Sequence, residues 1–271
     1  MLKKTFWASI LIIICFQVCL QAQVDKKPIS LGEQITLNSN ILQEKRTVNI
    51  YLPEGYEEEP SNSYPVIYLL DGGLSEDFIH LTGIVQFGSF SWINMLPQSI
   101  VVGTCNVDRK RDFTYPSTFQ LDQEELPTSG GSANFIAFLK NELQPYISKT
   151  YRVNNQKTII GQSLGGLLAT EILFTQPSLF NNYIIVSPSL WWDSENLLKS
   201  KPEIHPETAN IFVSVGKEGE VMERTARELF QLLKNQPFPK TKLYFQFMED
   251  KNHGDALHQS VYNAFEKFYT P

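Results

Sequence analysis

Basic charge and cysteine are both scarce in this 271-residue sequence. Lysine and arginine number 23 against 29 acidic residues, which gives a net charge of −6, and the basic residues form no stripe. An acidic chain of this kind argues against nucleic acid or an anionic membrane as a partner. Only three cysteines are present, and two of them, Cys15 and Cys19, lie close to the N-terminus.

The sequence also lacks long hydrophobic runs, except for one near its N-terminus. There Lys3 and Lys4 precede an apolar run that extends to Leu20, and the small residue Ala22 follows. This run is short for a membrane span, and the pattern is typical of a secretory signal peptide. We therefore expect residues 1–22 to be cleaved off as a signal peptide, which predicts export to the periplasm or the medium and no stable membrane insertion.

Cleavage at this point would leave Cys105 as the single cysteine. No intramolecular disulfide is then available, so the fold must be held by its hydrophobic core. The net charge would change from −6 to about −8, because two lysines and no acidic residue are removed. The sequence has no internal repeat or linker, and the remaining length can bury one core. We expect residues 23–271 to form a single domain.

Short apolar runs alternate with segments of helical periodicity along this domain. Tyr64–Leu70 contains a continuous apolar run, typical of a central strand, whereas Arg46–Leu52 alternates as a half-buried edge strand does. This alternation of strands and helices predicts a mostly parallel sheet with helices on both faces, in the α/β class. The expected strands are 33–38, 45–52, 64–70, 99–104, 157–160, 183–186, 210–215 and 242–247, and the expected helices are 132–143, 167–173, 221–233 and 254–268, with a polar loop over 105–131.

A serine between two glycines, Gly161-Gln162-Ser163-Leu164-Gly165, joins an expected strand to an expected helix. Strand, tight turn and helix are the context of a nucleophile elbow, which exposes the serine hydroxyl at the carboxyl edge of the sheet. Gly161 and Gly165 are expected to leave room for the bend. The N–H of Leu164 lies at the start of the helix, where it predicts a donor for an oxyanion.

A second oxyanion donor is expected from the loop after the strand at 64–70. This loop contains Gly72, Gly73 and Leu74. Glycine allows close approach of the backbone to a ligand, and we favour Gly73.

A serine nucleophile needs a base, and histidine is the usual one. His253 follows the last expected strand after a short loop and precedes Gly254. This is the place for the histidine in the chain order serine, acid, histidine. His258 falls inside the final helix, and His80 and His205 lie elsewhere in the chain, so we expect these three to be structural or surface residues.

The acid of such a triad is expected after the strand that ends at Gly216. Glu218 and Glu220 both follow this strand closely. Either is also an ordinary acidic residue at a helix N-terminus, where the helix dipole favours negative charge. Spacing does not separate them; we favour Glu218, with Glu220 as the alternative and Asp193 as a third candidate.

Other side chains are candidates for substrate contacts. Arg109 and Arg111 follow the strand at 99–104 and could bind an anionic or catechol-bearing group. The adjacent Asp108 and Asp112 favour a structural ion-pair network instead. Trp191 is predicted to stack on a substrate ring, with Trp192 in the core. Four apolar residues either line an acyl pocket or fill the core under a lid: Phe87, Phe90, Trp92 and Met95.

Taken together, these motifs resemble the esterase D-like branch of the α/β hydrolases, most closely the enterobactin esterase type. The resemblance extends from about Pro28 to the C-terminus and is specific because it involves a set of motifs in order. The matching stretches are Val66-Ile67-Tyr68-Leu69-Leu70-Asp71-Gly72, Asn106-Val107-Asp108-Arg109-Lys110-Arg111-Asp112, Gly161-Gln162-Ser163-Leu164-Gly165-Gly166, Ser187-Pro188-Ser189-Leu190-Trp191-Trp192, Val215-Gly216-Lys217-Glu218 and Asn252-His253-Gly254.

The resemblance implies an α/β-hydrolase fold, an acyl-enzyme at Ser163, and no metal or organic cofactor. Relatives of this type include siderophore, feruloyl and acetyl esterases and mycolyltransferases. We therefore expect a secreted serine esterase whose partner is a small soluble ester, such as a siderophore trilactone or a feruloyl or acetyl sugar ester. One alternative is an acyltransferase of the mycolyltransferase type. Another is a non-catalytic binding relative, against which the nucleophile, base and acid candidates argue.

Overall fold

The computed structural model describes residues 25–202, 205–236 and 240–269. The chain divides into a segment that ends at Leu31 and a compact unit, Gly32–Pro271. Residues 25–31 contain no helix or strand. The predicted signal peptide and its cleavage point lie outside the described residues. Within the described residues, none of the helices has the length and apolar character needed to cross a membrane.

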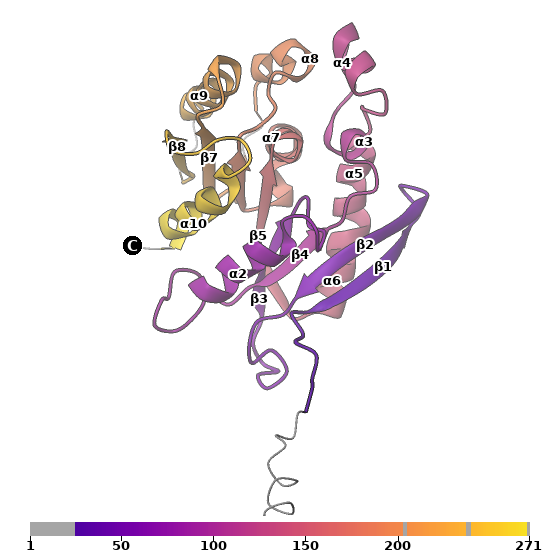
Figure 1. The fold of residues 1–271 in the computed structure, drawn as a ribbon, viewed down its shortest axis with the longest axis vertical. Helices are drawn as coiled ribbons and strands as arrows, with labels where there is room; N and C mark the ends of the chain where they lie inside the picture. Colours follow the sequence, from indigo (N-terminus) through magenta and orange to yellow (C-terminus); the bar gives the residue numbers. More distant parts are fainter. Residues whose placement is uncertain (1–24, 203–204, 237–239, 270–271) are drawn as a thin grey trace, which may run out of the picture. The chain divides into compact units, whose positions relative to one another are not determined.

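The compact unit is built on one eight-stranded sheet (Figure 1). Its strands lie in the order β1-β2-β4-β3-β5-β6-β7-β8. From β4 onward in this order all pairs are parallel, whereas β1 and β2 run antiparallel to their neighbours. The predicted fold class is thus confirmed. The strands are β1 (Glu33–Ser39), β2 (Glu44–Tyr51), β3 (Tyr64–Leu69), β4 (Ile100–Thr104), β5 (Val153–Gln162), β6 (Asn182–Val186), β7 (Asn210–Gly216) and β8 (Lys242–Met248).

The prediction that residues 45–52 form an edge strand is wrong. β2 pairs with β1 on one side and with β4 on the other, so β1 is the edge strand. Both Val48 and Ile50 are fully buried, and the polar Asn49 between them is buried as well. The side chain of Asn49 donates to the Gly72 carbonyl at 2.8 Å, which explains why an alternating pattern occurs inside the sheet.

Helices cover both faces of the sheet (Figure 1). One face packs against a cluster that includes buried residues of α5, α6, α7 and α9, whereas the buried residues of α2 and α10 lie outside that cluster. The longer helices are α2 (Phe78–Gly88), α5 (Ser132–Phe138), α6 (Gln144–Thr150), α7 (Leu164–Thr175), α9 (Glu220–Lys234) and α10 (Ala256–Tyr269). Short turns complete the unit: α3 (Arg109–Phe113), α4 (Gln120–Glu125), η1 (Leu139–Leu143), η2 (Pro177–Leu179), α8 (Trp192–Glu195) and η3 (Asn196–Lys199).

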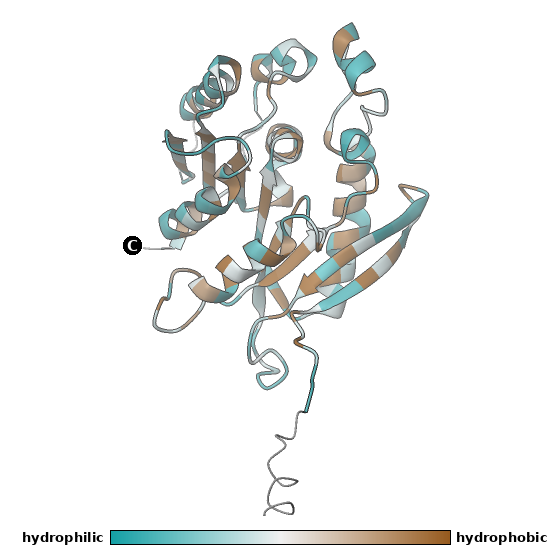
Figure 2. Cartoon of the chain, viewed as in Figure 1, coloured by the Kyte–Doolittle hydropathy of each residue, from teal (hydrophilic) through white to brown (hydrophobic). Residues whose placement is uncertain are grey.

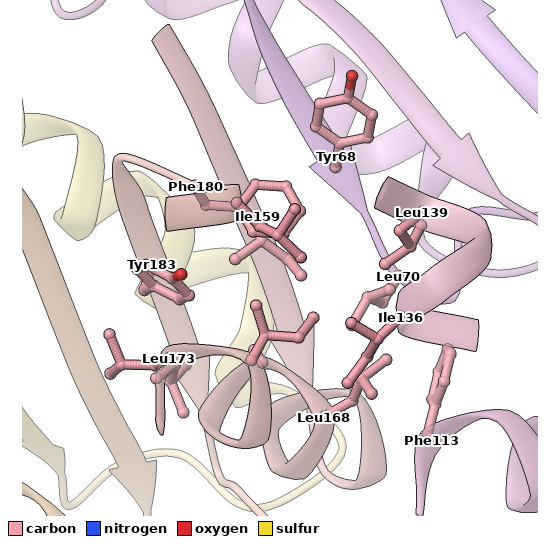
Figure 3. Close-up of a cluster of buried hydrophobic side chains, with 14 of the residues drawn as sticks. Tyr68, Leu70, Phe113, Ile136, Leu139, Ile159, Leu168, Leu173, Phe180 and Tyr183 are labelled. Atoms are coloured by element: carbon pink, nitrogen blue, oxygen red, sulfur yellow. The ribbon is translucent and has the colours of Figure 1, made fainter. Parts of the chain in front are cut away.

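Alternation along the central strands explains the two-sided core. Figure 2 shows the central strands as mostly hydrophobic and β1 and β2 as banded with polar residues. On β3, Val66 and Tyr68 belong to the α7-side cluster, whereas Ile67 between them is buried outside it. The α7 side of this core is drawn in Figure 3, with side chains that include Leu70, Phe113, Ile136, Ile159, Leu168, Leu173 and Tyr183.

Two helical predictions needed refinement. The helix expected at 132–143 is α5, and it passes through the wide π-helical turn η1 into α6. Pro145 lies in the first turn of α6, where it has no N–H to donate and its ring would clash with a regular preceding turn. The wider turn accommodates the ring. The segment 105–131, expected to be a polar loop, contains α3 and α4. The sequence did not predict α2.

Candidate active site

The turn between β5 and α7 holds Ser163 in a strained conformation. Its φ is 58° and its ψ is −120°, a region that non-glycine residues rarely occupy. Backbone hydrogen bonds fix this geometry: the Ser163 N–H donates to the Val186 carbonyl at 3.1 Å, and the Ser163 carbonyl accepts from Leu167 at 2.9 Å and from Ser189 at 3.0 Å. The turn therefore has the backbone form of a nucleophile elbow.

Glycines make this turn sterically possible, but not quite as expected. A Cβ on Gly161 would lie 2.3 Å from the Gly165 carbonyl oxygen, so a side chain is excluded there. A Cβ on Gly165 would find its nearest neighbour at 3.4 Å, which is an ordinary contact. The second crowded position is instead Gly166, whose Cβ would lie 3.0 Å from the Pro188 Cα.

The hydroxyl of Ser163 is half-buried and lies 3.3 Å from the Ser189 hydroxyl. Either oxygen can act as the donor. No hydrogen bond between Ser163 and His253 occurs among the described residues. Sequence reasoning did not single out Ser189, although it belongs to the Ser187-Pro188-Ser189 stretch that follows β6 at the same sheet edge.

His253 pairs with Glu218 at this edge. Its Nδ1 lies 2.6 Å from Glu218 Oε2, and the Glu218 side chain is only 2 % exposed, whereas that of His253 is 49 % exposed. The Gln162 side chain donates to the His253 carbonyl at 2.5 Å, which joins the histidine loop to the residue before the serine. With Nδ1 engaged by the carboxylate, Nε2 is the nitrogen left to accept a proton.

The carboxylate of Glu218 is well supplied with donors. Besides His253, the Ser187 hydroxyl lies 2.5 Å from Oε1 and the Gly216 N–H donates to the same oxygen at 2.9 Å. Burial acts to raise the pKa of Glu218, but these hydrogen bonds outweigh it and hold the pKa below its ordinary value. Glu218 is therefore ionised at neutral pH and can stabilise a protonated imidazole.

The other two acid candidates lie elsewhere. Glu220 is the exposed first residue of α9, beyond Gly219, whose φ of 92° turns the chain away from the strand. Asp193 is buried, and its Oδ1 accepts from the Thr118 N–H at 2.7 Å and from the Thr118 hydroxyl at 2.8 Å. Neither has a hydrogen bond to His253 in the described part of the chain.

The two expected oxyanion donors differ in their present partners. Leu164 is the first residue of α7, so its N–H has no acceptor within the helix. The Gly73 N–H donates to Glu76 Oε2 at 2.7 Å, and the Gly72 N–H donates to the Thr104 carbonyl at 2.9 Å. The Gly73 N–H, which the sequence predicts as an oxyanion donor, is thus already hydrogen-bonded to the Glu76 carboxylate.

Arg109 lies beside the elbow and is held by an acid that sequence reasoning missed. Its Nε and Nη2 donate to the two carboxylate oxygens of Asp71 at 2.6 and 2.9 Å, and Nη2 also reaches the Gln162 carbonyl at 3.2 Å. Nη1 has no partner among the described residues. Arg111 instead joins Asp112 and Glu44 in the ion-pair network predicted as the structural interpretation.

The two tryptophans differ in burial, and the predicted core position of Trp192 is confirmed. Trp192 is fully buried, and its indole N–H donates to the Tyr115 carbonyl at 2.8 Å. Trp191 is 38 % exposed and lies two residues beyond Ser189, whose hydroxyl contacts that of Ser163. A partly exposed indole at this position in the chain is suited to stacking on a substrate ring, which stays a prediction.

The apolar residues considered for an acyl pocket lie at the wrong edge of the sheet. α2 leaves the carboxyl edge after β3 and ends at Gly88, shortly before β4 begins at the amino edge. Phe90 and Trp92 stack there with ring centroids 4.6 Å apart and line a hollow together with Tyr51. Phe87 is partly exposed and Met95 is buried. They do not line a pocket at Ser163.

No group of three or more metal-ligating side chains is arranged to hold an ion in residues 25–202, 205–236 and 240–269. The site consists instead of a strained serine, a histidine paired with an ionised carboxylate, and backbone donors at a helix start. Such a set can activate a hydroxyl as a nucleophile and stabilise an oxyanion.

Comparison with known proteins identifies the group to which this arrangement belongs. Residues 39–265 match the family described as "Putative esterase". The ferri-bacillibactin esterase BesA of Bacillus subtilis (strain 168) is 31 % identical over 212 residues, which cover 70 % of this chain and 73 % of BesA.

Solved structures agree with this grouping. The BES protein from Bacillus cereus superposes with a TM-score of 0.80 at 30 % identity, covering 93 % of this chain and 100 % of that one. An IroE-like serine hydrolase from Shewanella oneidensis superposes with a TM-score of 0.79 at 26 % identity, covering 88 % of this chain and 80 % of that one.

Proposed function

Because the chain belongs to this esterase family, we propose that it is an exported serine carboxylic-ester hydrolase that works through an acyl-enzyme at Ser163. One observation carries the assignment of roles. Nδ1 of His253 lies 2.6 Å from the buried Glu218 carboxylate, and the histidine loop is joined to the serine elbow through Gln162. Ser163 is the nucleophile, His253 the base and Glu218 the acid of the triad.

In this mechanism His253 Nε2 removes the proton from Ser163 as Oγ attacks the ester carbonyl. The hydroxyl first turns from Ser189 toward the imidazole; hydrogen bonds of this kind often tighten only when substrate is bound. The Leu164 N–H stabilises the tetrahedral oxyanion. The Gly73 N–H does so once Glu76 has released it. His253 then protonates the leaving alcohol. In the second half of the reaction His253 removes a proton from water, the water attacks the acyl-enzyme, and His253 returns the proton to Ser163 as the acid leaves.

The proposed substrate is a soluble siderophore ester such as a trilactone, with feruloyl or acetyl sugar esters as the other candidates. The ferri-bacillibactin esterase BesA supports the first choice. The half-exposed face of Trp191 suits an aromatic ring near the serine. Arg109 is oriented by Asp71, and its Nη1 is available for an anionic or catechol oxygen.

The decisive experiment is hydrolysis of p-nitrophenyl acetate by the mature protein. Ser163→Ala is expected to lower kcat at least about a hundredfold, the scale of losing an essential catalytic group. Ser89→Ala, which removes a hydroxyl at the end of α2, is the matched control and should retain wild-type activity. Wild-type activity in Ser163→Ala would remove the mechanism.

Two further measurements concern the acceptor and the compartment. Water as acceptor predicts that added alcohol leaves the free acid as the main product, whereas an acyltransferase would form the new ester.

Export is proposed from the N-terminal pattern of residues 1–22 alone. It predicts that the protein recovered from the periplasm or the medium begins at Gln23, and recovery of the uncleaved chain from the cytoplasm would contradict it.

A further inference from the structure

Two histidines from different helices meet on the α2–α10 face of the sheet. Nδ1 of His80, in α2, lies 3.2 Å from Nδ1 of His258, in α10. The two rings are nearly parallel, with an interplanar angle of 22° and centroids 5.4 Å apart. The described contacts of the proposed triad include neither residue.

Asp77 orients one of these rings. Its Oδ1 lies 3.0 Å from His80 Nε2. A carboxylate accepts this hydrogen bond, so in a neutral His80 ring Nε2 carries the proton and Nδ1 presents a lone pair. Carboxylate, imidazole and then a metal ion is the usual arrangement of a metal-binding histidine, in which the carboxylate fixes the tautomer and ring orientation.

The spacing of the two nitrogens fits a tetrahedral ion. With Zn–N bonds of about 2.05 Å and tetrahedral angles, two nitrogen ligands lie roughly 3.3 Å apart. The measured separation is 3.2 Å. His258 offers Nδ1 as its ligand atom, so the two nitrogens that face each other are the two that would hold the ion.

We propose that His80 and His258 bind one divalent transition-metal ion, with Zn²⁺ as the preferred occupant. Imidazole nitrogen suits Zn²⁺, Cu²⁺ and Ni²⁺ rather than Mg²⁺ or Ca²⁺. The described residues bring no third histidine, cysteine or carboxylate into a metal-holding group, so water fills the other positions. With the ion bound through both Nδ1 atoms, each ring would carry its proton on Nε2.

Such an ion would fasten two elements that flank the proposed active site. α2 follows the loop that contains Gly73, and α10 follows the loop that contains His253. Their only direct polar side-chain contact among the described residues is the His80–His258 pair. An ion that binds the folded pair and not the unfolded chain raises the melting temperature, and the shift grows with the ratio of ion concentration to Kd.

The test is Zn²⁺ titration of the mature protein by isothermal calorimetry, with thermal unfolding measured in parallel. The wild type is expected to bind one Zn²⁺ per chain and to show a higher Tm with Zn²⁺ than without it. His80→Ala and His258→Ala should each abolish binding and the Tm shift. Asp77→Asn should weaken binding roughly tenfold or more, because the His80 ring loses its orienting carboxylate.

Two matched controls remove a histidine elsewhere. His205→Ala and His253→Ala are expected to bind Zn²⁺ as the wild type does. Circular dichroism verifies that every variant is folded. No binding by the wild type, unchanged binding in His258→Ala, or loss of binding in His253→Ala would each overturn the proposal, and none of these outcomes depends on esterase activity.

Discussion

Two enclosed glutamates have pKa values shifted in opposite directions, although burial acts to raise both. Glu218, after β7, receives hydrogen bonds from His253, Ser187 and Gly216, and its pKa lies below the ordinary value. Glu171, in α7, receives one, from the Ser132 hydroxyl at 2.9 Å, and its Oε2 is buried with no partner. Burial raises the pKa of Glu171 to about 7.

The difference shows that donors rather than enclosure decide whether a carboxyl group is charged. Three donors replace the lost hydration of Glu218 and keep it ionised, as an imidazolium partner requires. A single donor leaves Glu171 only half ionised near neutrality. The first group is organised to carry charge, whereas the second bears on stability alone.

Removing the charge of Glu218 should have the largest effect. Glu218→Gln keeps the shape but offers His253 an amide, which favours the wrong tautomer, and kcat should fall about a thousandfold or more. Steady-state kinetics on p-nitrophenyl acetate measures this. Glu220→Gln is the control and should stay within about twofold of the wild type, as expected for an exposed surface change. Equal mild losses in the two variants would contradict the assignment of the acid.

Removing the charge of Glu171 should change stability and its pH dependence instead. Below pH 4.5 the group is protonated in both states; as pH rises toward 7, the unfolded chain loses its proton and the folded protein retains it. The wild type therefore loses stability over this window, by roughly 3 kcal/mol. The side chain that Glu171→Gln introduces does not titrate. The free energy of unfolding of Glu171→Gln, relative to that of the wild type, should therefore rise by about this amount between pH 4.5 and pH 8.

Denaturant unfolding of both proteins at these two pH values gives the comparison. Activity at neutral pH serves as the internal control, since Glu171 has no contact with the proposed triad among its described hydrogen bonds. A stability difference that is the same at both pH values would show that Glu171 is already ionised in the folded protein.

Removing one donor from Glu218 should have the smallest effect. The pKa of Glu218 is lowered in the folded protein, so its stabilisation is present above pH 4.5 and is lost as pH falls through the folded-state pKa. Ser187→Ala removes one charge-assisted hydrogen bond and should cost about 1.5 kcal/mol at pH 7 and less at pH 3. Ser187 has a φ of 43°, a strained value for a non-glycine residue. The same change in a Glu218→Gln background separates the lost hydrogen bond from an effect on this strain. If Ser187→Ala lowers the free energy of unfolding by the same amount at both pH values and in both backgrounds, the Ser187 hydrogen bond does not stabilise the Glu218 charge.

Local patterns were enough to predict the strands, the elbow and the histidine loop. The strand expected at 64–70 and the turn at Ser163 are specified by residues adjacent in the chain, and the structure contains both, the strand as Tyr64–Leu69. The position of His253 after the last strand follows from strand order at one sheet edge.

Features that depend on contacts between distant residues could not be predicted. Glu218 and Glu220 differ only in what the turn at Gly219 does to their directions. Asp71 binds Arg109 from another strand end, and Glu76 occupies the Gly73 amide, although neither acid has a recognisable pattern. Likewise, nothing local in the sequence indicates that α2 carries Phe90 to the far edge.

The bond between Gln162 and His253 joins residues 91 positions apart. The serine turn can form as soon as β5 and α7 pack, but His253, its proposed base, is positioned only with the final strand and the loop beyond it. Contacts of such long range form late in folding. We therefore expect a growing or partly folded chain to be inactive toward esters. Activity recovered after dilution from denaturant should then follow the docking of β8 rather than the collapse of the core.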